Sequence, residues 1–242
     1  MRPYGERTYR ERIRVKDLVS FRVVVKETDL WVSAGRDLEK ETRDLVLDCR
    51  HQLEMYIRSH PEFAAALLPY KEDPLAPALV REMIEASREV GVGPMASVAG
   101  AIAQNVGGGL LKLTDQVIVE NGGDIFLKAS RDVTVSIFAG SSPLSEKLGL
   151  LIHVPQMPLG ICSSSGTVGH SLSRGITDVV CLLSSSAALA DGAATALGNR
   201  VKRKTDLERV AEWAGRIDGI VGGVVIVKDR MATWGDIELV GL

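Results

Sequence analysis

The sequence predicts a single-domain α+β protein in which antiparallel sheets pack against helices. Three observations lead to this class. Strand-like segments outnumber what a regular alternation of strands and helices would supply, the helices fall in blocks, and no stretch of linker-like composition divides the 242 residues. Regular alternation is typical of doubly wound parallel sheets, so its absence favours antiparallel pairing. We therefore expect residues 1–242 to form one domain.

The first hundred residues are predicted to contain two strands followed by helices. Val23 and Trp31 belong to β-branched and aromatic runs on either side of a polar turn. Apolar side chains recur at helical spacing from Leu38 to Ile57, and Pro61 ends this helix. The expected elements are strands at 21–26 and 30–34, helices at 38–57 and 79–90, a short helix within the proline-bearing segment 61–77, and a helix of small residues at 95–103 that frays at the glycines 107–109.

The remainder of the chain is predicted to hold most of the strands. Asn121-Gly122 supplies the positive φ angles of a tight hairpin. Ser184 to Ser186 offers capping hydroxyls in front of an alanine-rich helix. The expected elements are strands at 117–120, 125–128, 133–138, 150–153, 160–162 and 178–183, helices at 187–197 and 207–217, and closing strands at 224–227 and 237–240.

Composition and charge restrict the class of partner. The chain is 45% hydrophobic and 25% charged, as globular proteins are. Its net charge of −2 argues against a general nucleic-acid or anionic-membrane binder. Three cysteines without a CxxC pair fit a reducing compartment. No apolar run has the length of a signal peptide or a bilayer span. We expect a cytoplasmic protein with no nucleic-acid or membrane partner.

Two oxygen-bearing side chains one helical turn apart form the strongest candidate site. Asp191 and Thr195 occupy positions i and i+4 of the alanine-rich helix, so both can point to one spot. A carboxylate and a hydroxyl suit a hard cation such as Mg²⁺, which keeps water and binds substrate phosphate. A second interpretation stays open, in which Asp191 complements the helix dipole from the first turn and Thr195 bonds its own backbone.

Three segments resemble the ApbE-type flavin transferases. Residues 117–125 resemble the family's strand–Gly-Gly–strand segment, and Ser163-Ser164-Ser165-Gly166 resembles its Thr-Ser-Gly segment. The stretch from Asp191 to Thr195 is similar to its Ala-Asp-Ala-x-x-Thr-Ala metal motif. The order is preserved, and a final strand pair follows like the family's closing hairpin. The resemblance is clearest over 90–242 and implies an ApbE-like, T-fold-like domain.

The resemblance also implies a cofactor and an activity. FAD would lie in a cleft, and Mg²⁺ would help split its diphosphate; FMN would then pass to a threonine of an acceptor protein or be released by hydrolysis. Asp191, Thr195 and the Ala96 carbonyl would hold the metal. His170 is the candidate catalytic base, and Arg174 could contact phosphate. The candidate cofactor-binding residues are Ala96, Ser97, Gly122, Gly123, Ser165, Gly166 and Arg174.

Departures from the family pattern keep other hypotheses open. Ser97 stands where the family usually has a lysine, and no Asp-Pro follows His170. Both favour a non-transferase protein of the same fold that binds another small ligand, such as a pterin-like or nucleotide compound. A third hypothesis is a structural or assembly protein whose small residues allow tight packing between the subunits of a homo-oligomer. A hydrolase built on Cys162 is disfavoured, because Cys162 falls in a predicted strand and is expected to be packed.

Overall fold

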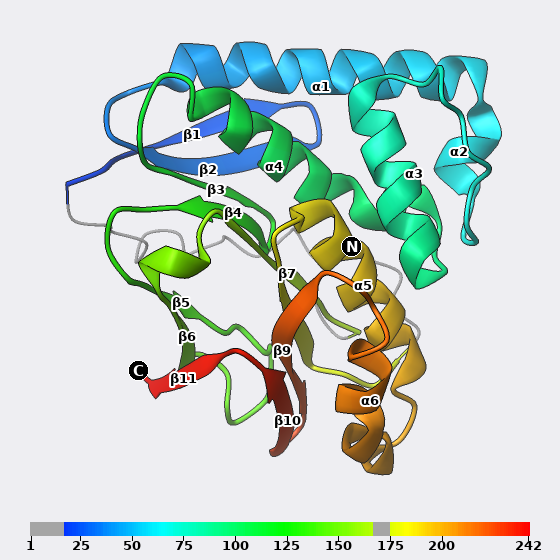
Figure 1. Ribbon diagram of the computed structural model, residues 1–242, viewed down its shortest axis with the longest axis vertical. Helices are drawn as coiled ribbons and strands as arrows, with labels where there is room; N and C mark the ends of the chain where they lie inside the picture. The colour runs from blue at the N-terminus through cyan, green and yellow to red at the C-terminus, as the bar shows by residue number, and fades with distance from the viewer. Residues whose placement is uncertain (1–16, 167–174) are drawn as a thin grey trace.

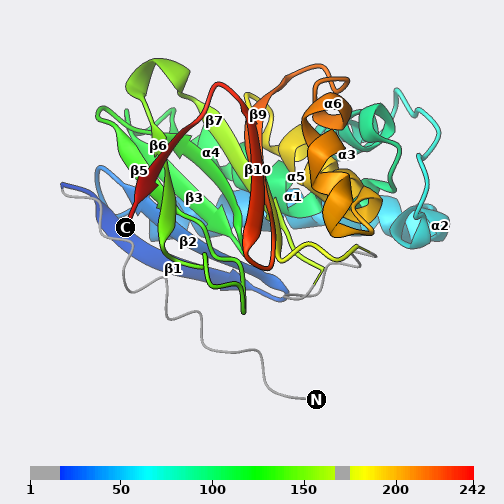
Figure 2. The same ribbon diagram turned by 90° about the horizontal axis from the view of Figure 1, so that it is seen from below.

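The computed structural model describes residues 17–166 and 175–242, which form three layers. An eight-stranded sheet is the middle layer, with the helices on one face and a three-stranded sheet on the other (Figure 1, Figure 2). All the strand pairs in these residues are antiparallel. The predicted α+β class is therefore confirmed. No helix in these two ranges combines the length and hydropathy that crossing a bilayer requires.

The two sheets contain every strand that the sequence predicts. The large sheet has the order β1-β2-β3-β4-β7-β8-β9-β10, and the small sheet has the order β11-β6-β5. The bounds of the strands are β1 (Val19–Val25), β2 (Thr28–Ala34), β3 (Val117–Asn121), β4 (Asp124–Lys128), β5 (Val133–Ser136), β6 (Leu148–Ile152), β7 (Leu159–Ser164), β8 (Val179–Ser184), β9 (Ile220–Val227), β10 (Arg230–Gly235) and β11 (Glu238–Gly241).

The end of the chain differs from the predicted closing pair. β9 forms a hairpin with β10, which the sequence prediction missed, and β11 crosses to pair with β6 in the small sheet. β10 is an edge strand whose residues are mostly exposed, so it lacks the apolar alternation by which strands are recognised. The segments 224–227 and 237–240 are strands, but they belong to different sheets.

The helices agree with the prediction except at three places, one of which is the predicted helix 95–103, whose first residues form the separate 3₁₀ helix η2. Their bounds are α1 (Glu39–Ser59), α2 (Pro61–Ala65), α3 (Ala78–Val90), η2 (Pro94–Ser97), α4 (Val98–Leu110), η3 (Val154–Gln156), α5 (Ala187–Arg200), η4 (Lys204–Arg209) and α6 (Val210–Ala214). The region 207–217 contains the end of the 3₁₀ helix η4 and the short α6 instead of one helix. The predicted fraying at the glycines 107–109 is wrong, because α4 continues to Leu110.

Packing explains why α4 continues through its glycines. A Cβ on Gly107 would lie 2.2 Å from Phe126 Cδ1, and one on Gly109 would lie 2.7 Å from Leu45 Cδ2. Burial of these neighbours against the bare backbone outweighs the weak helix propensity of glycine. Tertiary contacts, which the local sequence does not contain, therefore keep this segment helical.

Three apolar clusters join the layers. One lies between the first strands and helices α1, α3 and α4, and a second lies between the later strands and helices α5 and α6. The third fills the space between the two sheets and includes Leu127, Leu150 and Ile226. Because both faces of β7 and β8 are covered, nearly every residue of these two strands is buried.

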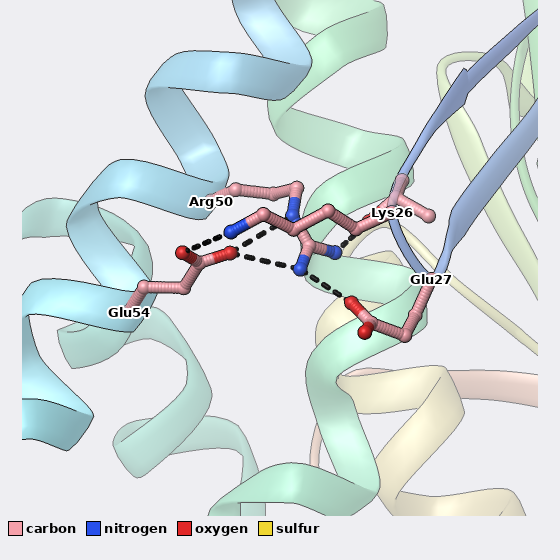
Figure 3. A network of polar contacts seen from close by, with 5 residues as sticks. Lys26, Glu27, Arg50 and Glu54 are labelled. Atoms are coloured by element: carbon pink, nitrogen blue, oxygen red, sulfur yellow. Dashed lines mark hydrogen bonds and ion pairs between the residues drawn. The ribbon is translucent and has the colours of Figure 1, made fainter.

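A polar network fixes α1 to the turn between β1 and β2 (Figure 3). Arg50 of α1 donates to Thr28 Oγ1 (2.8 Å) and pairs with Glu27 (2.5 Å) and Glu54 (2.8 Å). Lys26 in the turn pairs with the same Glu54 carboxylate (2.7 Å). Only 15% of the Arg50 side chain is exposed, so its contacts are less screened than those of an ordinary surface pair.

His153, directly after β6, lies between two carboxylates, and we call these two contacts the histidine clasp. His153 Nδ1 lies 2.7 Å from Asp132 Oδ2, and its Nε2 lies 3.1 Å from Glu238 Oε2 on β11. The hydrogen bond to Asp132, followed by that to Glu238, raises the pKa of His153. The clasp therefore stabilises the fold fully below the unfolded histidine pKa of about 6.5, and this contribution disappears as pH rises through the higher folded pKa.

We expect His153→Gln to lower the melting temperature at pH 6 and to change it less at pH 9. Melting curves of both proteins across this range measure the effect. A difference in melting temperature that is the same at every pH would contradict a charge-dependent clasp.

Candidate functional site

The site is built around the first two turns of α5. Ser186 caps this helix, its hydroxyl accepting the N–H of Leu189 (3.2 Å). Two glycines let other backbones approach Ala187 at the start of the helix. A Cβ on Gly100 of α4 would lie 2.2 Å from the Ala187 carbonyl oxygen, and one on Gly160 of β7 would lie 2.4 Å from its Cα. At these two glycines the backbones of α4 and β7 therefore lie directly against Ala187.

Asp191 lies one turn further along α5 and points to the start of α4. Its Oδ2 accepts the N–H of Gly100 (2.9 Å). The first turn of α5 contains no acidic residue, so Asp191 does not act as the first-turn dipole partner that the second interpretation required. Thr195 follows one turn later and is half-buried, and the hydrogen bonds of the described residues include none from its hydroxyl.

A second carboxylate reaches this place from the β3–β4 hairpin. Asp124 begins β4 and is 7% exposed, and its Oδ1 accepts the N–H of Ser163 on β7 (3.2 Å). The predicted hairpin is confirmed, but its positive φ angles are at Gly122 (72°) and Gly123 (123°), because Asn121 is the last residue of β3 and pairs with Asp124. Asn121 Nδ2 donates to the Ala99 carbonyl oxygen (3.1 Å), which ties the hairpin to the start of α4.

The two carboxylates interact without a balancing charge, Asp124 being buried and Asp191 partly buried. Burial, and then the charge of Asp124, raises the pKa of Asp191 well above its usual range. Burial also raises the pKa of Asp124 to about 7, with Glu120 adding to the shift. In ranges 17–166 and 175–242 neither side chain has a lysine or arginine partner. Buried charges are normally paired or bound to a metal, so this pair favours a cation.

The oxygen-rich surroundings fit a hard cation such as Mg²⁺ better than zinc. No group of three or more histidine, cysteine, aspartate or glutamate side chains gathers into a metal cage in the described ranges. Mg²⁺ does not need one, because it uses one or two carboxylates and completes its shell with water and phosphate. Ser164 on β7 follows the Ser163 whose N–H Asp124 accepts. Its hydroxyl is buried and has no hydrogen-bond partner in the described part, so it is a further candidate oxygen ligand.

The other predicted site residues lie in two places. Ala96 and Ser97 belong to η2, which packs against α5. Ser97 is fully buried, and its Oγ would lie 2.6 Å from a Cβ on Gly192, the neighbour of Asp191. Ser165 and Gly166 follow β7, where the Gly166 N–H donates to the Thr177 carbonyl oxygen (3.0 Å). His170 and Arg174 lie outside the described residues.

Cys162 is packed, as its position in a strand predicts. It is fully buried, its Sγ donates to the Ala187 carbonyl oxygen (3.2 Å), and burial raises the pKa of its thiol. A thiol in this state is a poor nucleophile. This is the third contact to Ala187 in the first turn of α5, after those of Gly100 and Gly160.

Asp124 is the site residue that the sequence reasoning left without a role. It lies inside the Gly-Gly segment, directly before an apolar strand. Side chains alternate along a strand, so Asp124 shares the helix-facing side of β4 with the buried Phe126. A carboxylate at a position where alternation predicts burial is the signal that could have identified it.

The sequence matches a protein-family model described as AbpE bacteria over residues 10–229. A UPF0280 protein of Methanothrix thermoacetophila is 41% identical over 198 residues, which are 81% of this chain and 82% of that protein. A UPF0280 protein of Methanocaldococcus jannaschii is 38% identical over 228 residues, which are 90% of this chain and 92% of that protein.

Two solved structures show the same fold at low sequence identity. The apo flavinyl transferase ApbE of Pseudomonas stutzeri has a TM-score of 0.60 at 14% identity and covers 90% of this chain and 94% of its own. A mutant of the flavin transferase ApbE of Vibrio cholerae has a TM-score of 0.57 at 12% identity, with coverages of 90% and 97%. These likenesses concern the fold.

Proposed function

We propose that this chain, which belongs to the AbpE bacteria family and is a divergent ApbE-like branch together with the UPF0280 proteins, binds a flavin or related nucleotide diphosphate through a divalent cation. The observation that carries the proposal is the carboxylate pair of Asp124, which is buried, and Asp191, which is partly buried; neither has a cationic partner among the described residues. A diphosphate ligand alone would add negative charge to this pair. A cation between them removes that conflict.

The residues around the pair fall into metal ligands and candidate nucleotide contacts. Asp191 and Thr195 would hold Mg²⁺ together with the Ala96 carbonyl, and Asp124 adds a second negative charge that favours a dication. Mg²⁺ bound there would neutralise the negative charge that develops when a diphosphate bond breaks. The glycines 122 and 123 leave open backbone at the hairpin, where Gly123 has no neighbour within 4 Å of a built Cβ. Ser165, Gly166, His170 and Arg174 stay predictions for the nucleotide side.

The activity that fits these parts is cleavage of the FAD diphosphate. The FMN phosphoryl group would pass to the hydroxyl of a threonine on an acceptor protein, or to water, as the diphosphate P–O bond breaks and AMP leaves. The solved relatives are named as flavin and flavinyl transferases, which supports a flavin as the nucleotide.

The position of Ser97 favours a second candidate, a ligand-binding protein without transfer activity. The lysine that usually occupies this position in the resembling family is replaced here by a side chain sealed against Gly192. A longer side chain at Ser97 would have to displace α5. Nucleotide binding without FMN transfer would distinguish this candidate from the first.

A thermal-shift series with FAD, FMN and ADP, each with Mg²⁺ or EDTA, tests the proposal. We expect FAD with Mg²⁺ to stabilise the protein, by about 2.7 kcal/mol at one hundred times the dissociation constant. Asp191→Asn and Thr195→Val should each remove the Mg²⁺-dependent part, because each deletes an oxygen ligand. Asp115→Asn, at an exposed position remote in sequence, is the matched control and should behave as the wild type. Stabilisation that is equal in Mg²⁺ and EDTA would refute the metal assignment.

A further inference from the structure

Gln104 of α4 links two other helices through the two ends of its amide. Its Nε2 donates to Glu82 Oε1 on α3 (2.5 Å), and its Oε1 accepts the N–H of Ala187, the first residue of α5 (2.6 Å). The first N–H groups of a helix have no partner within the helix. The Gln104 carbonyl therefore fixes the N-terminal end of α5 from the side of α4.

Glu82 determines which way this amide points. Its second oxygen accepts the Nδ2 hydrogen of Asn105 (2.6 Å), and Asn105 also donates to the Ala101 carbonyl oxygen (2.9 Å). A carboxylate only accepts and a backbone N–H only donates, so the Gln104 nitrogen must face Glu82 and its oxygen must face Ala187. An amide at position 104 and a carboxylate at position 82 are matched parts of one bridge.

The bridge ends where the site begins. Ala187 is the residue that Gly100, Gly160 and Cys162 also contact, and Asp191 is one helical turn away. The Asp191 carboxylate reaches Gly100 N only if α5 does not shift along its own axis relative to α4. The glycines set how close α5 can approach, whereas the Gln104 hydrogen bond sets its position along its axis.

We propose that Gln104, oriented by Glu82, is a positioning residue that places Asp191 for cation binding. The inference rests on the proposed function for its ligand, but its geometric part concerns only the start of α5. Gln104→Glu keeps an acceptor for Ala187 and places a second carboxylate against Glu82, which pushes the bridge apart. Combining it with Glu82→Gln restores one donor and one acceptor with the roles exchanged.

The chain supplies a matched control on another helix. Gln52 of α1 donates to Asp48 (2.8 Å) and accepts the N–H of Leu79 (3.4 Å), near the start of α3. Gln52→Glu therefore perturbs the same kind of bridge at a helix that does not carry Asp191. It reports the general effect of such a substitution on the fold.

The test measures Mn²⁺ affinity by titration calorimetry at pH 8.5 for the wild type and for each variant. We expect Gln104→Glu to weaken Mn²⁺ binding at least tenfold, the double variant to return within threefold of the wild type, and Gln52→Glu to bind as the wild type does. A single variant that is still folded and binds Mn²⁺ normally would overturn the proposal, as would a double variant no better than the single one.

Amide hydrogen exchange of residues 187–191 separates this inference from the proposed function. Faster exchange in Gln104→Glu that the double variant reverses supports the positioning of α5, even if the wild type binds no Mn²⁺. In that event the metal assignment fails while the bridge stands. Unchanged exchange in all variants would overturn the bridge itself.

Discussion

Gly100→Ala is expected to destabilise the protein by about 3 kcal/mol, near the upper part of the range for overpacked interiors. The new Cβ would lie 2.2 Å from the Ala187 carbonyl oxygen and 2.9 Å from Asp191 Cβ, so α4 and α5 must separate. For a chain of this size the melting temperature should fall by about 8 °C. Divalent-cation affinity should fall as well, because the Gly100 N–H that holds Asp191 moves away.

Gly108→Ala is the matched control within the same helix. Gly108 is exposed, and a Cβ there would meet nothing within 4 Å. In an open helical position alanine is favoured over glycine by about 0.5–1 kcal/mol, so this variant should melt slightly higher than the wild type. Equal melting temperatures for the two variants would show that α4 and α5 are not in close contact. Denaturant or thermal unfolding followed by circular dichroism measures both.

Asp124→Asn is expected to stabilise the metal-free protein at pH 8, by on the order of 3 kcal/mol. Asp124 has a folded pKa of about 7, raised mainly by burial, against an unfolded value of about 3.9. Its stabilising contribution is therefore fully present below about pH 4 and is lost as pH rises through about 7. The asparagine variant lacks this loss, so its advantage over the wild type should be small at pH 4 and largest at pH 8.

Mg²⁺ should reverse the order of the two proteins. The wild type should gain stability from the cation, whereas the variant has one negative charge less to attract it. Asp178→Asn is the control, because Asp178 is also fully buried but accepts the Lys228 N–H (2.5 Å) and faces the Lys228 ammonium (3.6 Å). Removing a paired buried charge should destabilise. If Asp124→Asn melts lower than the wild type in EDTA at pH 8, the carboxylate pair is not a site of unbalanced charge.

Local sequence predicted the strands and the long helices because each carries its own periodicity. The strands β1 and β2, the helical spacing of α1 and the β3–β4 hairpin are confirmed, although the turn of the hairpin is Gly122-Gly123 and not Asn121-Gly122. The exceptions depend on contacts distant in sequence. β10 is exposed and has no apolar pattern, and α4 stays helical through Gly107 because Phe126 packs there.

The site was predictable in part for the same reason. The spacing of Asp191 and Thr195 marks one helix face, which the local sequence contains. The partnership of Asp191 with Gly100 spans 91 residues, and its coupling with Asp124 requires the hairpin to fold beneath α5. Neither follows from spacing. The bridge through Gln104 also joins three helices and has no motif of its own.

The close approach of α4, β7 and η2 to α5 restricts how these segments can change over evolution. Gly100 and Gly160 face Ala187, and Gly192 faces Ser97, so each contact pairs a bare backbone with a small partner. If one member of a contact becomes bulkier, only a smaller residue at the position it contacts can make room for it. Among homologues, the residues on the two sides of each contact should therefore change together, whereas a residue such as Gly108 should vary independently.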